Sequence, residues 1–103
     1  MTVYTYLWGF IVEPEHVDEF ERQYGPQGSW VELFRRAPGY LQTLLLRDST
    51  DSRRFVTIDR WESPEAYRRF RSAFSAQYTD LDRRCERLTV RETLLGNFDE
   101  TTV

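Results

Sequence analysis

The sequence predicts an α+β fold, in which an antiparallel four-stranded sheet carries helices on one face. A strand, a proline-led helix, a short second helix and another strand follow one another over residues 3–47, and the same order returns over residues 54–97. The segments 14–39 and 64–88 are nearly equal in length. Two intercalated units of this kind make a ferredoxin-like βαββαβ arrangement.

Residues 3–13 are expected to form the first strand. Aromatic and smaller side chains alternate along it, as in a strand buried on both faces. The aromatic set is Tyr4, Tyr6, Trp8 and Phe10. Pro14 then opens a helix whose apolar residues recur at helical spacing until Gly25 ends it.

A second short helix is predicted from the capping-box spacing of Ser29 and Glu32, whose side chains would each bond a free backbone N–H group. Pro38 ends this helix. Residues 40–48 follow as the second strand. The polar turn 49–52 indicates that this strand forms an antiparallel hairpin with the third.

The third strand and the helix after it are the most sharply specified part of the chain. Residues 54–62 alternate with the period of a strand. One face carries Phe55, Thr57, Asp59 and Trp61, and the other carries Val56, Ile58 and Arg60. Ser63 is expected to cap a helix over residues 63–74, with Pro64 in its first turn and an aromatic stripe facing the sheet.

The last part of the chain is expected to hold a short helix and the fourth strand. Residues 79–82 can cap the helix, which offers Leu81 and Cys85 to the interior. The strand runs from about residue 88 to residue 97, and residues 99–103 form a frayed tail. The chain is therefore expected to be a single domain, 1–103, with its core at about 3–98.

Charge and composition argue against several classes of function. The net charge of −3 gives no reason to expect a nucleic-acid partner, and no run reaches the length of a membrane span. Cys85 is the only cysteine, so no internal disulfide can form, and no basic segment precedes the first apolar run. The expected location is therefore the reducing cytoplasm.

The sheet face away from the helices poses a problem for a monomer. It would carry Val56, Ile58 and one apolar set from each remaining strand, which is a larger patch than monomers usually expose. The simplest cover is the same face of a second copy. A two-fold homodimer is therefore predicted.

Three segments resemble one known family. A strand leads into Pro14 and a helix with Phe20; residues 37–41, Ala-Pro-Gly-Tyr-Leu, look like an entry to strand two; and residues 59–67, Asp-Arg-Trp-Glu-Ser-Pro-Glu-Ala-Tyr, look like an E-x-W-x-S-x-E-A segment. Over about residues 4–98 the chain resembles the antibiotic biosynthesis monooxygenase domain family of the dimeric α+β barrel superfamily. The third segment is the most specific of the three.

The resemblance implies a pocket between the sheet and the helices of each subunit. Family members include cofactor-independent oxygenases of polyketide-type phenols, haem-degrading enzymes and quinol oxygenases. Haem degradation is disfavoured, because Trp8 stands near the position of the required Asn and the second-half helix has no His. Trp61 and Tyr67 agree with the phenol oxygenases, while Thr57 replaces their strand-three Asn.

Asp59 is the most informative candidate residue, because a buried carboxylate is costly unless it is paired or protonated. It is either a base whose pKa burial raises, or a partner of Arg83, Arg84 or a helix N-terminus. Trp61 lines the cavity or packs in the core. Tyr67 donates to a substrate carbonyl or bonds Asp59.

The remaining polar residues suggest no further chemistry. His16 is expected on the surface without a Cys or carboxylate cluster, so no metal site is predicted. The arginines of the second half alternate with acidic residues and predict a solvated, salt-bridged face. Cys85 is expected to be a small core residue.

Two function hypotheses stay open. The first is an oxygenase of a small phenolic aromatic that uses no metal, flavin or other cofactor: Asp59 accepts the substrate proton, Tyr67 stabilises the oxyanion and Trp61 stacks on the ring. Thr57, Tyr6 and Trp8 would complete the pocket wall. The second is a small-molecule-binding or stress-associated domain with a closed apolar pocket and no turnover.

Overall fold

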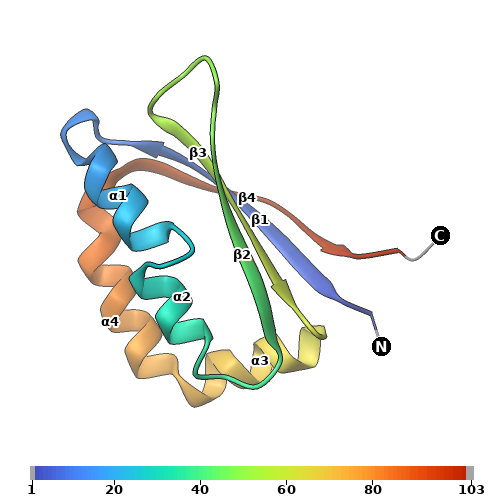
Figure 1. Ribbon diagram of the computed structural model, residues 1–103. Coiled ribbons are helices and arrows are strands. Elements are labelled where there is room, and N and C mark those ends of the chain that lie inside the picture. The colour runs from blue at the N-terminus through green and yellow to red at the C-terminus, as the bar shows by residue number, and fades with distance from the viewer. Residues whose placement is uncertain (1, 102–103) are drawn as a thin grey trace.

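The computed structural model describes residues 2–101, and its elements follow the predicted βαββαβ order. Four antiparallel strands form one sheet in the order β2-β3-β1-β4 (Figure 1). The strands are β1 (Tyr4–Val12), β2 (Tyr40–Arg47), β3 (Arg54–Trp61) and β4 (Thr89–Asp99). The ferredoxin-like α+β fold is confirmed, with β3 and β1 at the centre of the sheet.

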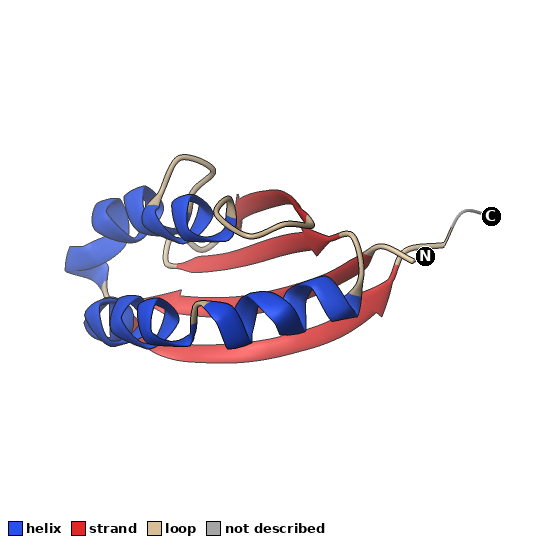
Figure 2. Ribbon diagram, turned by 90° about the horizontal axis from the view of Figure 1, so that it is seen from below, coloured by secondary structure: helices blue, strands red, loops and turns tan. Residues whose placement is uncertain are grey.

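The helices gather on one face of the sheet (Figures 1 and 2). They are α1 (Val17–Tyr24), α2 (Ser29–Phe34), α3 (Pro64–Ala73) and α4 (Ser75–Cys85), with 3₁₀ turns η1 (Pro14–His16) before α1 and η2 (Glu86–Leu88) after α4. Within residues 2–101, no helix is both long enough and apolar enough to cross a membrane. The opposite face of the sheet is left without a helical layer.

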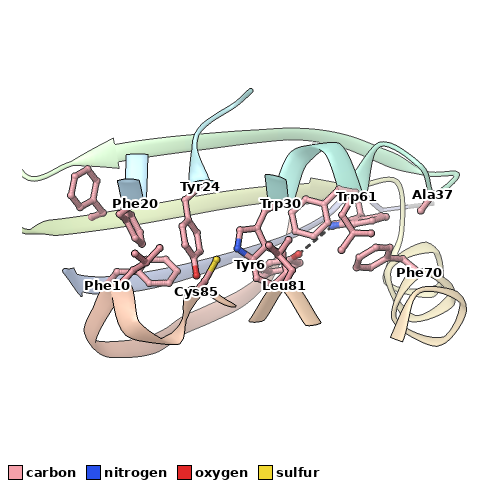
Figure 3. Packing of buried hydrophobic residues seen from close by; sticks show 14 of the residues in the cluster. Tyr6, Phe10, Phe20, Tyr24, Trp30, Ala37, Trp61, Phe70, Leu81 and Cys85 are labelled. Carbon is pink, nitrogen blue, oxygen red and sulfur yellow. Dashed lines mark hydrogen bonds between the residues drawn. The ribbon is translucent and has the colours of Figure 1, made fainter. Parts of the chain in front are cut away.

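Aromatic side chains fill the space between the sheet and the helices (Figure 3). Phe20 of α1 stacks on Tyr24 with 4.2 Å between ring centroids, and Trp61 of β3 meets Phe34 of α2 edge-on at 5.7 Å. Burial of one such ring contributes about 2 kcal/mol or more. The aromatic layer therefore does much to set the spacing between sheet and helices.

The junction of β3 and α3 forms as predicted. The strand alternation puts one set of side chains under the helices, all of them buried: Phe55, Thr57, Asp59 and Trp61. Ser63 ends the strand in an extended conformation, and its Oγ accepts the N–H of Ala66 at 3.1 Å. Pro64 occupies the first turn, where its missing N–H costs nothing.

Two other predicted helix caps are wrong. Ser29 does not cap α2, because Gly28 holds the N-cap position and the Ser29 hydroxyl donates to the side-chain oxygen of Gln23 instead. Thr79 does not begin the last helix, since α4 already starts at Ser75, directly after the end of α3. At Ser29 the local capping signal failed because a nearby side chain accepts the hydroxyl hydrogen bond. At Thr79 it failed because the helical path resumes after the single irregular residue Phe74.

The predicted frayed tail is wrong for its first two residues. Asp99 still belongs to β4, and the Glu100 carboxylate bonds Arg60 at 2.6 Å and the hydroxyl of Thr5 at 2.7 Å. The Arg60 bond, with a smaller effect from Thr5, lowers the pKa of Glu100 to about 2. Residues 102 and 103 of the predicted tail lie outside the described residues.

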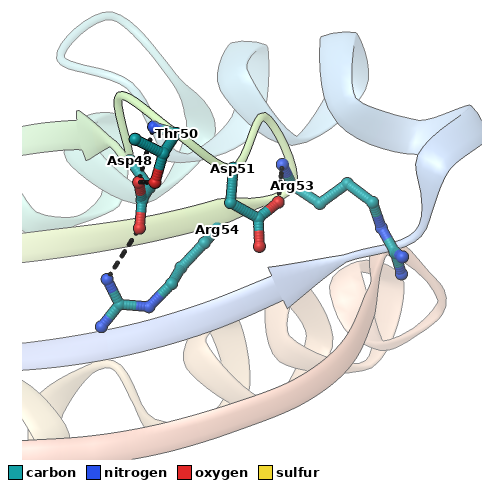
Figure 4. A network of polar contacts seen from close by, with 5 residues as sticks. All are labelled: Asp48, Thr50, Asp51, Arg53 and Arg54. Atoms are coloured by element: carbon teal, nitrogen blue, oxygen red, sulfur yellow. Dashed lines mark hydrogen bonds and ion pairs between the residues drawn. The ribbon is translucent and has the colours of Figure 1, made fainter.

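The turn between β2 and β3 confirms the predicted hairpin (Figure 4). Asp48 Oδ1 accepts the N–H and the hydroxyl of Thr50 at 2.8 and 2.9 Å, and Asp48 Oδ2 pairs with Arg54 at 3.1 Å. Asp51 accepts the backbone N–H of Arg53 at 3.0 Å. These bonds satisfy the turn backbone and hold the hairpin register.

The outer face of the sheet is apolar. Leu44, Ile58 and Leu7 lie next to one another on β2, β3 and β1. Leu46 is 48 % exposed, and Leu95 lies against the backbone of Gly9. In the part of the chain that the structure describes, the helices cover only the other face, so this face is open to solvent in the single chain.

Candidate active site

A cavity of about 350 Å³ lies between the sheet and the helices. All four strands and helices α1 to α4 contribute to its wall. Its lining residues are Tyr6, Trp8, Phe10, Tyr24, Trp30, Thr43, Thr57, Asp59, Arg71, Tyr78, Asp82 and Glu92. Six of these twelve residues are aromatic and six are polar or charged. A cavity of this volume that combines aromatic rings with polar groups is suited to a small organic molecule.

Asp59 presents a buried carboxyl group to this cavity from the centre of β3. The side chain is 5 % exposed, and Oδ1 accepts the hydroxyl of Thr43 at 2.5 Å. Burial raises the pKa of Asp59 to about 7, against the lowering effect of the Thr43 bond. At neutral pH the group is therefore present in both forms, as a general base near its optimum requires.

The second oxygen of Asp59 faces the open space. Among residues 2–101, no side chain bonds Oδ2, and Trp30 Nε1 is the single enclosed side-chain polar atom that lacks a partner. Oδ2 must therefore be accessible from the cavity. The predicted alternative of an Asp59–arginine lock is wrong, because Arg84 pairs with Asp80 and no arginine of the described chain bonds Asp59.

Three of the predicted substrate-binding residues surround Asp59. Tyr6 on β1 lies directly across from Asp59, and Trp8 lies across from Thr57. All three line the cavity. Tyr6 accepts the indole N–H of Trp61 at 3.4 Å, and burial raises the pKa of the Tyr6 phenol well above its ordinary value. Tyr6 is therefore a neutral phenol that can still donate its own proton.

Trp61 and Tyr67 lie beside the cavity rather than in its wall. Trp61 is fully buried at 0 % exposure, and its N–H is used by Tyr6. The Tyr67 ring packs on Tyr6 at 4.9 Å between centroids, and its hydroxyl accepts an Arg71 N–H at 3.1 Å. Tyr67 does not bond Asp59. The structure brings both residues to the second layer, and their catalytic roles stay predictions.

Several residues of the cavity wall were not anticipated. Tyr24 and Trp30 belong to the apolar faces of α1 and α2, which helical spacing marks as buried but not as cavity wall. Tyr78 was missed because the start of α4 was misplaced. The guanidinium of Arg71 lies 3.8 Å from the centre of the Tyr78 ring. Trp30 Nε1 points toward the Tyr24 hydroxyl and the Cys85 thiol without meeting hydrogen-bond geometry (Figure 3).

A second groove, between α1 and α4, differs in character from this cavity. The groove between α1 and α4 is lined by alternating charges, and two of its arginines are paired, Arg87 with Glu19 and Arg84 with Asp80. These pairs confirm the predicted salt-bridged face, except that Arg71 of the same arginine series lines the cavity instead. Within residues 2–101, no three His, Cys, Asp or Glu side chains are grouped so as to hold a metal ion.

A comparison with protein families decides the membership of this chain. The sequence profile described as "Antibiotic biosynthesis monooxygenase" matches residues 9–79, which is more than half of the chain. The chain belongs to the antibiotic biosynthesis monooxygenase family. The matched range includes the end of β1, the β2–β3 hairpin and Asp59, whereas Tyr6 and Trp8 lie just before it. No curated protein matches the chain.

Several solved structures share the fold. SnoaB from Streptomyces nogalater, described as a cofactor-independent oxygenase, is 23% identical, with a TM-score of 0.68 over 100% of this chain and 97% of its own. The protein PA3566 from Pseudomonas aeruginosa is 22% identical, with a TM-score of 0.73 over 99% and 97%. At this level of identity the likeness establishes the architecture alone.

Proposed function

We propose that this family member is a cofactor-independent monooxygenase of an electron-rich phenolic aromatic of the polyketide type. The observation that carries the proposal is the free Oδ2 of Asp59, a buried carboxyl with a pKa of about 7 in a cavity walled by aromatic rings. A base of this strength can deprotonate a substrate whose carbanion is stabilised by adjoining rings. The likeness to SnoaB, a cofactor-independent oxygenase, agrees with this chemistry.

The reaction begins with transfer of a C–H proton from the bound aromatic to Asp59 Oδ2. The carbanion gives one electron to O₂, and the two radicals combine to form a peroxide anion on the same carbon. The peroxide anion takes up a proton from solvent, and loss of water leaves a carbonyl group, while the proton held by Asp59 is given up to solvent. A CH₂ group and O₂ thus become C=O and H₂O, and the substrate itself supplies the electrons.

The neighbours of Asp59 support the charge that develops on the ring. Tyr6 lies opposite the base and can donate to a substrate oxyanion. Trp8 and Thr57 shape the adjoining wall. In this proposal Trp61 and Tyr67 act through Tyr6, which Trp61 holds by its N–H and Tyr67 by ring packing.

The test is O₂ uptake by the protein with a panel of hydroxyanthrones, with ¹⁸O₂ used to follow one oxygen atom into the product. Asp59→Asn is expected to lower kcat by about 10² to 10⁴ because it removes a positioned base. Asp80→Asn is the matched control, since it neutralises an exposed carboxylate on α4 and should leave the rate within a factor of about two.

Two results would count against the proposal. Full activity in a folded Asp59→Asn variant would remove Asp59 from the reaction. Tight binding of the panel without any O₂ uptake would identify the protein as the alternative, a small-molecule-binding domain without turnover.

A further inference from the structure

A chain of two hydroxyl groups leads away from the candidate base. The Tyr40 phenol donates to Thr43 Oγ1 at 2.7 Å, and the Thr43 hydroxyl donates to Asp59 Oδ1 at 2.5 Å. Thr43 is buried, whereas Tyr40 is half buried at the start of the edge strand β2. The hydrogen-bonded chain therefore runs from the cavity toward the surface.

This chain exists because β2 is irregular at Leu41. Residues three apart on a regular strand point to opposite faces of the sheet. Here Tyr40 pairs with Trp61 and Gln42 with Arg60, so Leu41 is an extra residue, and Tyr40 returns to the inner face with Thr43. Without the irregularity, the phenol would be on the outer face.

We propose that Tyr40 and Thr43 are positioning residues, which bind Oδ1 of Asp59, aim Oδ2 at the substrate and exchange the proton of the carboxyl group with solvent while the cavity is occupied. The inference rests on the proposed function, since it concerns the same base. A bound aromatic would block the cavity, and the two hydroxyls offer a separate route on the other side of the carboxyl group.

The proton moves along this route by exchange of O–H bonds. The proton that Asp59 takes up at Oδ2 comes within reach of Thr43 when the carboxyl group and both hydroxyls rotate. The O–H bond of protonated Asp59 then breaks toward Thr43 Oγ1, and Thr43 passes its own proton to the Tyr40 oxygen. Tyr40 releases its phenol proton to water. No electrons move, and both hydroxyls regain their original composition.

Few other groups act on the ionisation of Asp59. Tyr6 faces it from β1 and Tyr40 from β2, both as neutral phenols at physiological pH. The remaining ionisable groups of the cavity wall are Tyr24 on α1, Arg71 on α3, Tyr78 and Asp82 on α4, and Glu92 on β4. Burial and the Thr43 bond are the causes that set the pKa of Asp59.

The relay formed by Tyr40, Thr43 and Asp59 is tested by direct titration of Asp59. The titration is followed through the ¹³C-labelled carboxyl resonance, which is assigned by its loss in Asp59→Asn. This measurement needs no substrate. Thr43→Val should raise the midpoint by about one pH unit, because a hydrogen bond to the charged form is lost. Tyr40→Phe should raise it by less, and Thr43→Ser should restore it.

Turnover supplies the second readout. Tyr40→Phe should lower kcat several-fold with little change in KM, because the proton route is interrupted while the cavity wall is intact. The matched controls are Thr5→Val, which removes a buried hydroxyl bonded to the Glu100 carboxylate, and Tyr4→Phe, which removes a phenol bonded to Asn97. Neither should move the Asp59 midpoint.

The relay is overturned if Thr43→Val and Tyr40→Phe leave the Asp59 midpoint unchanged, whatever the activity. The proton route is overturned if Tyr40→Phe moves the midpoint but keeps the wild-type kcat. Absence of O₂ uptake in every variant, with the midpoints shifted as expected, would reject the proposed oxygenase and leave the positioning of Asp59 intact.

Discussion

At the scale of single residues, Asp59 links chemistry to stability. The folded protein raises the pKa of this carboxyl from its ordinary value of 3.8 to about 7, so the folded state holds a proton that the unfolded chain has lost. Between these two values, the free energy of unfolding falls as the pH rises. The ionised carboxylate, which the proposed reaction needs, is therefore the form that destabilises the fold.

Asp59→Asn is expected to become progressively more stable than the wild type as the pH rises from about 4 to 8. The difference in free energy of unfolding should grow by up to about 4 kcal/mol, since one pKa unit corresponds to about 1.36 kcal/mol. Urea denaturation of both proteins at pH 4, 5.5 and 8 measures it. Asp48 and Glu100, whose pKa values are lowered, affect both proteins equally and cancel when their free energies of unfolding are subtracted. A difference that stays constant with pH would therefore contradict the raised pKa of Asp59.

The position of Asp59 was predictable, but its partner was not. Strand alternation alone places Asp59 with Thr57 and Trp61 on the helix-facing side. Thr43 belongs to another strand and reaches Asp59 only through the pairing register. Tyr40 reaches Thr43 only through the irregularity of β2 at Leu41, which no local sequence pattern predicts. Alternation is a property of one segment, whereas the relay needs two segments and their exact offset.

At the scale of elements, helix starts were predicted where all determinants are local. Ser63 follows a strand and precedes Pro64, and no other side chain competes for its hydroxyl. The predicted cap at Ser29 is wrong because Gln23, from the preceding helix, accepts the hydrogen bond of the Ser29 hydroxyl. The strand order and the hairpin followed from the repeated pattern of the two halves, which extends over nearly the whole chain.

Ser63→Ala is expected to lower the free energy of unfolding by about 1 kcal/mol, because the buried Ala66 N–H loses its acceptor. Chemical denaturation at neutral pH measures the loss. Ser75→Ala serves as the control, since Ser75 starts α4 and makes no capping bond. Equal effects of the two substitutions would show that the cap contributes nothing beyond helix propensity.

At the scale of the whole molecule, the outer face of the sheet calls for a partner. Leucines on β2 and β4 are 40 to 48 % exposed there, although the protein carries 30% charged residues. We propose that a second copy of the chain covers this face, since an apolar sheet face can pair with itself about a two-fold axis. The predicted homodimer therefore remains a proposal.

Sedimentation at micromolar concentration should give roughly twice the chain mass of 12.4 kDa. Leu46→Glu is expected to yield a folded monomer, because Leu46 is exposed in the single chain and a charge there disturbs only the dimer. Gln77→Glu adds the same charge on exposed α4 and should leave the dimer intact. A monomeric wild type would contradict the proposed dimer but not the ferredoxin-like fold.

Successive side chains of β3 point to opposite faces of the sheet, so one strand contributes to two different surfaces. Odd-numbered positions such as Thr57 and Asp59 line the cavity, and even-numbered positions such as Ile58 lie on the outer face of the sheet. Substitutions at odd positions should therefore change the cavity wall and leave the outer face of the sheet unchanged. A single inserted residue would move every following side chain of the strand to the opposite face of the sheet. The strand should therefore tolerate substitution but not insertion.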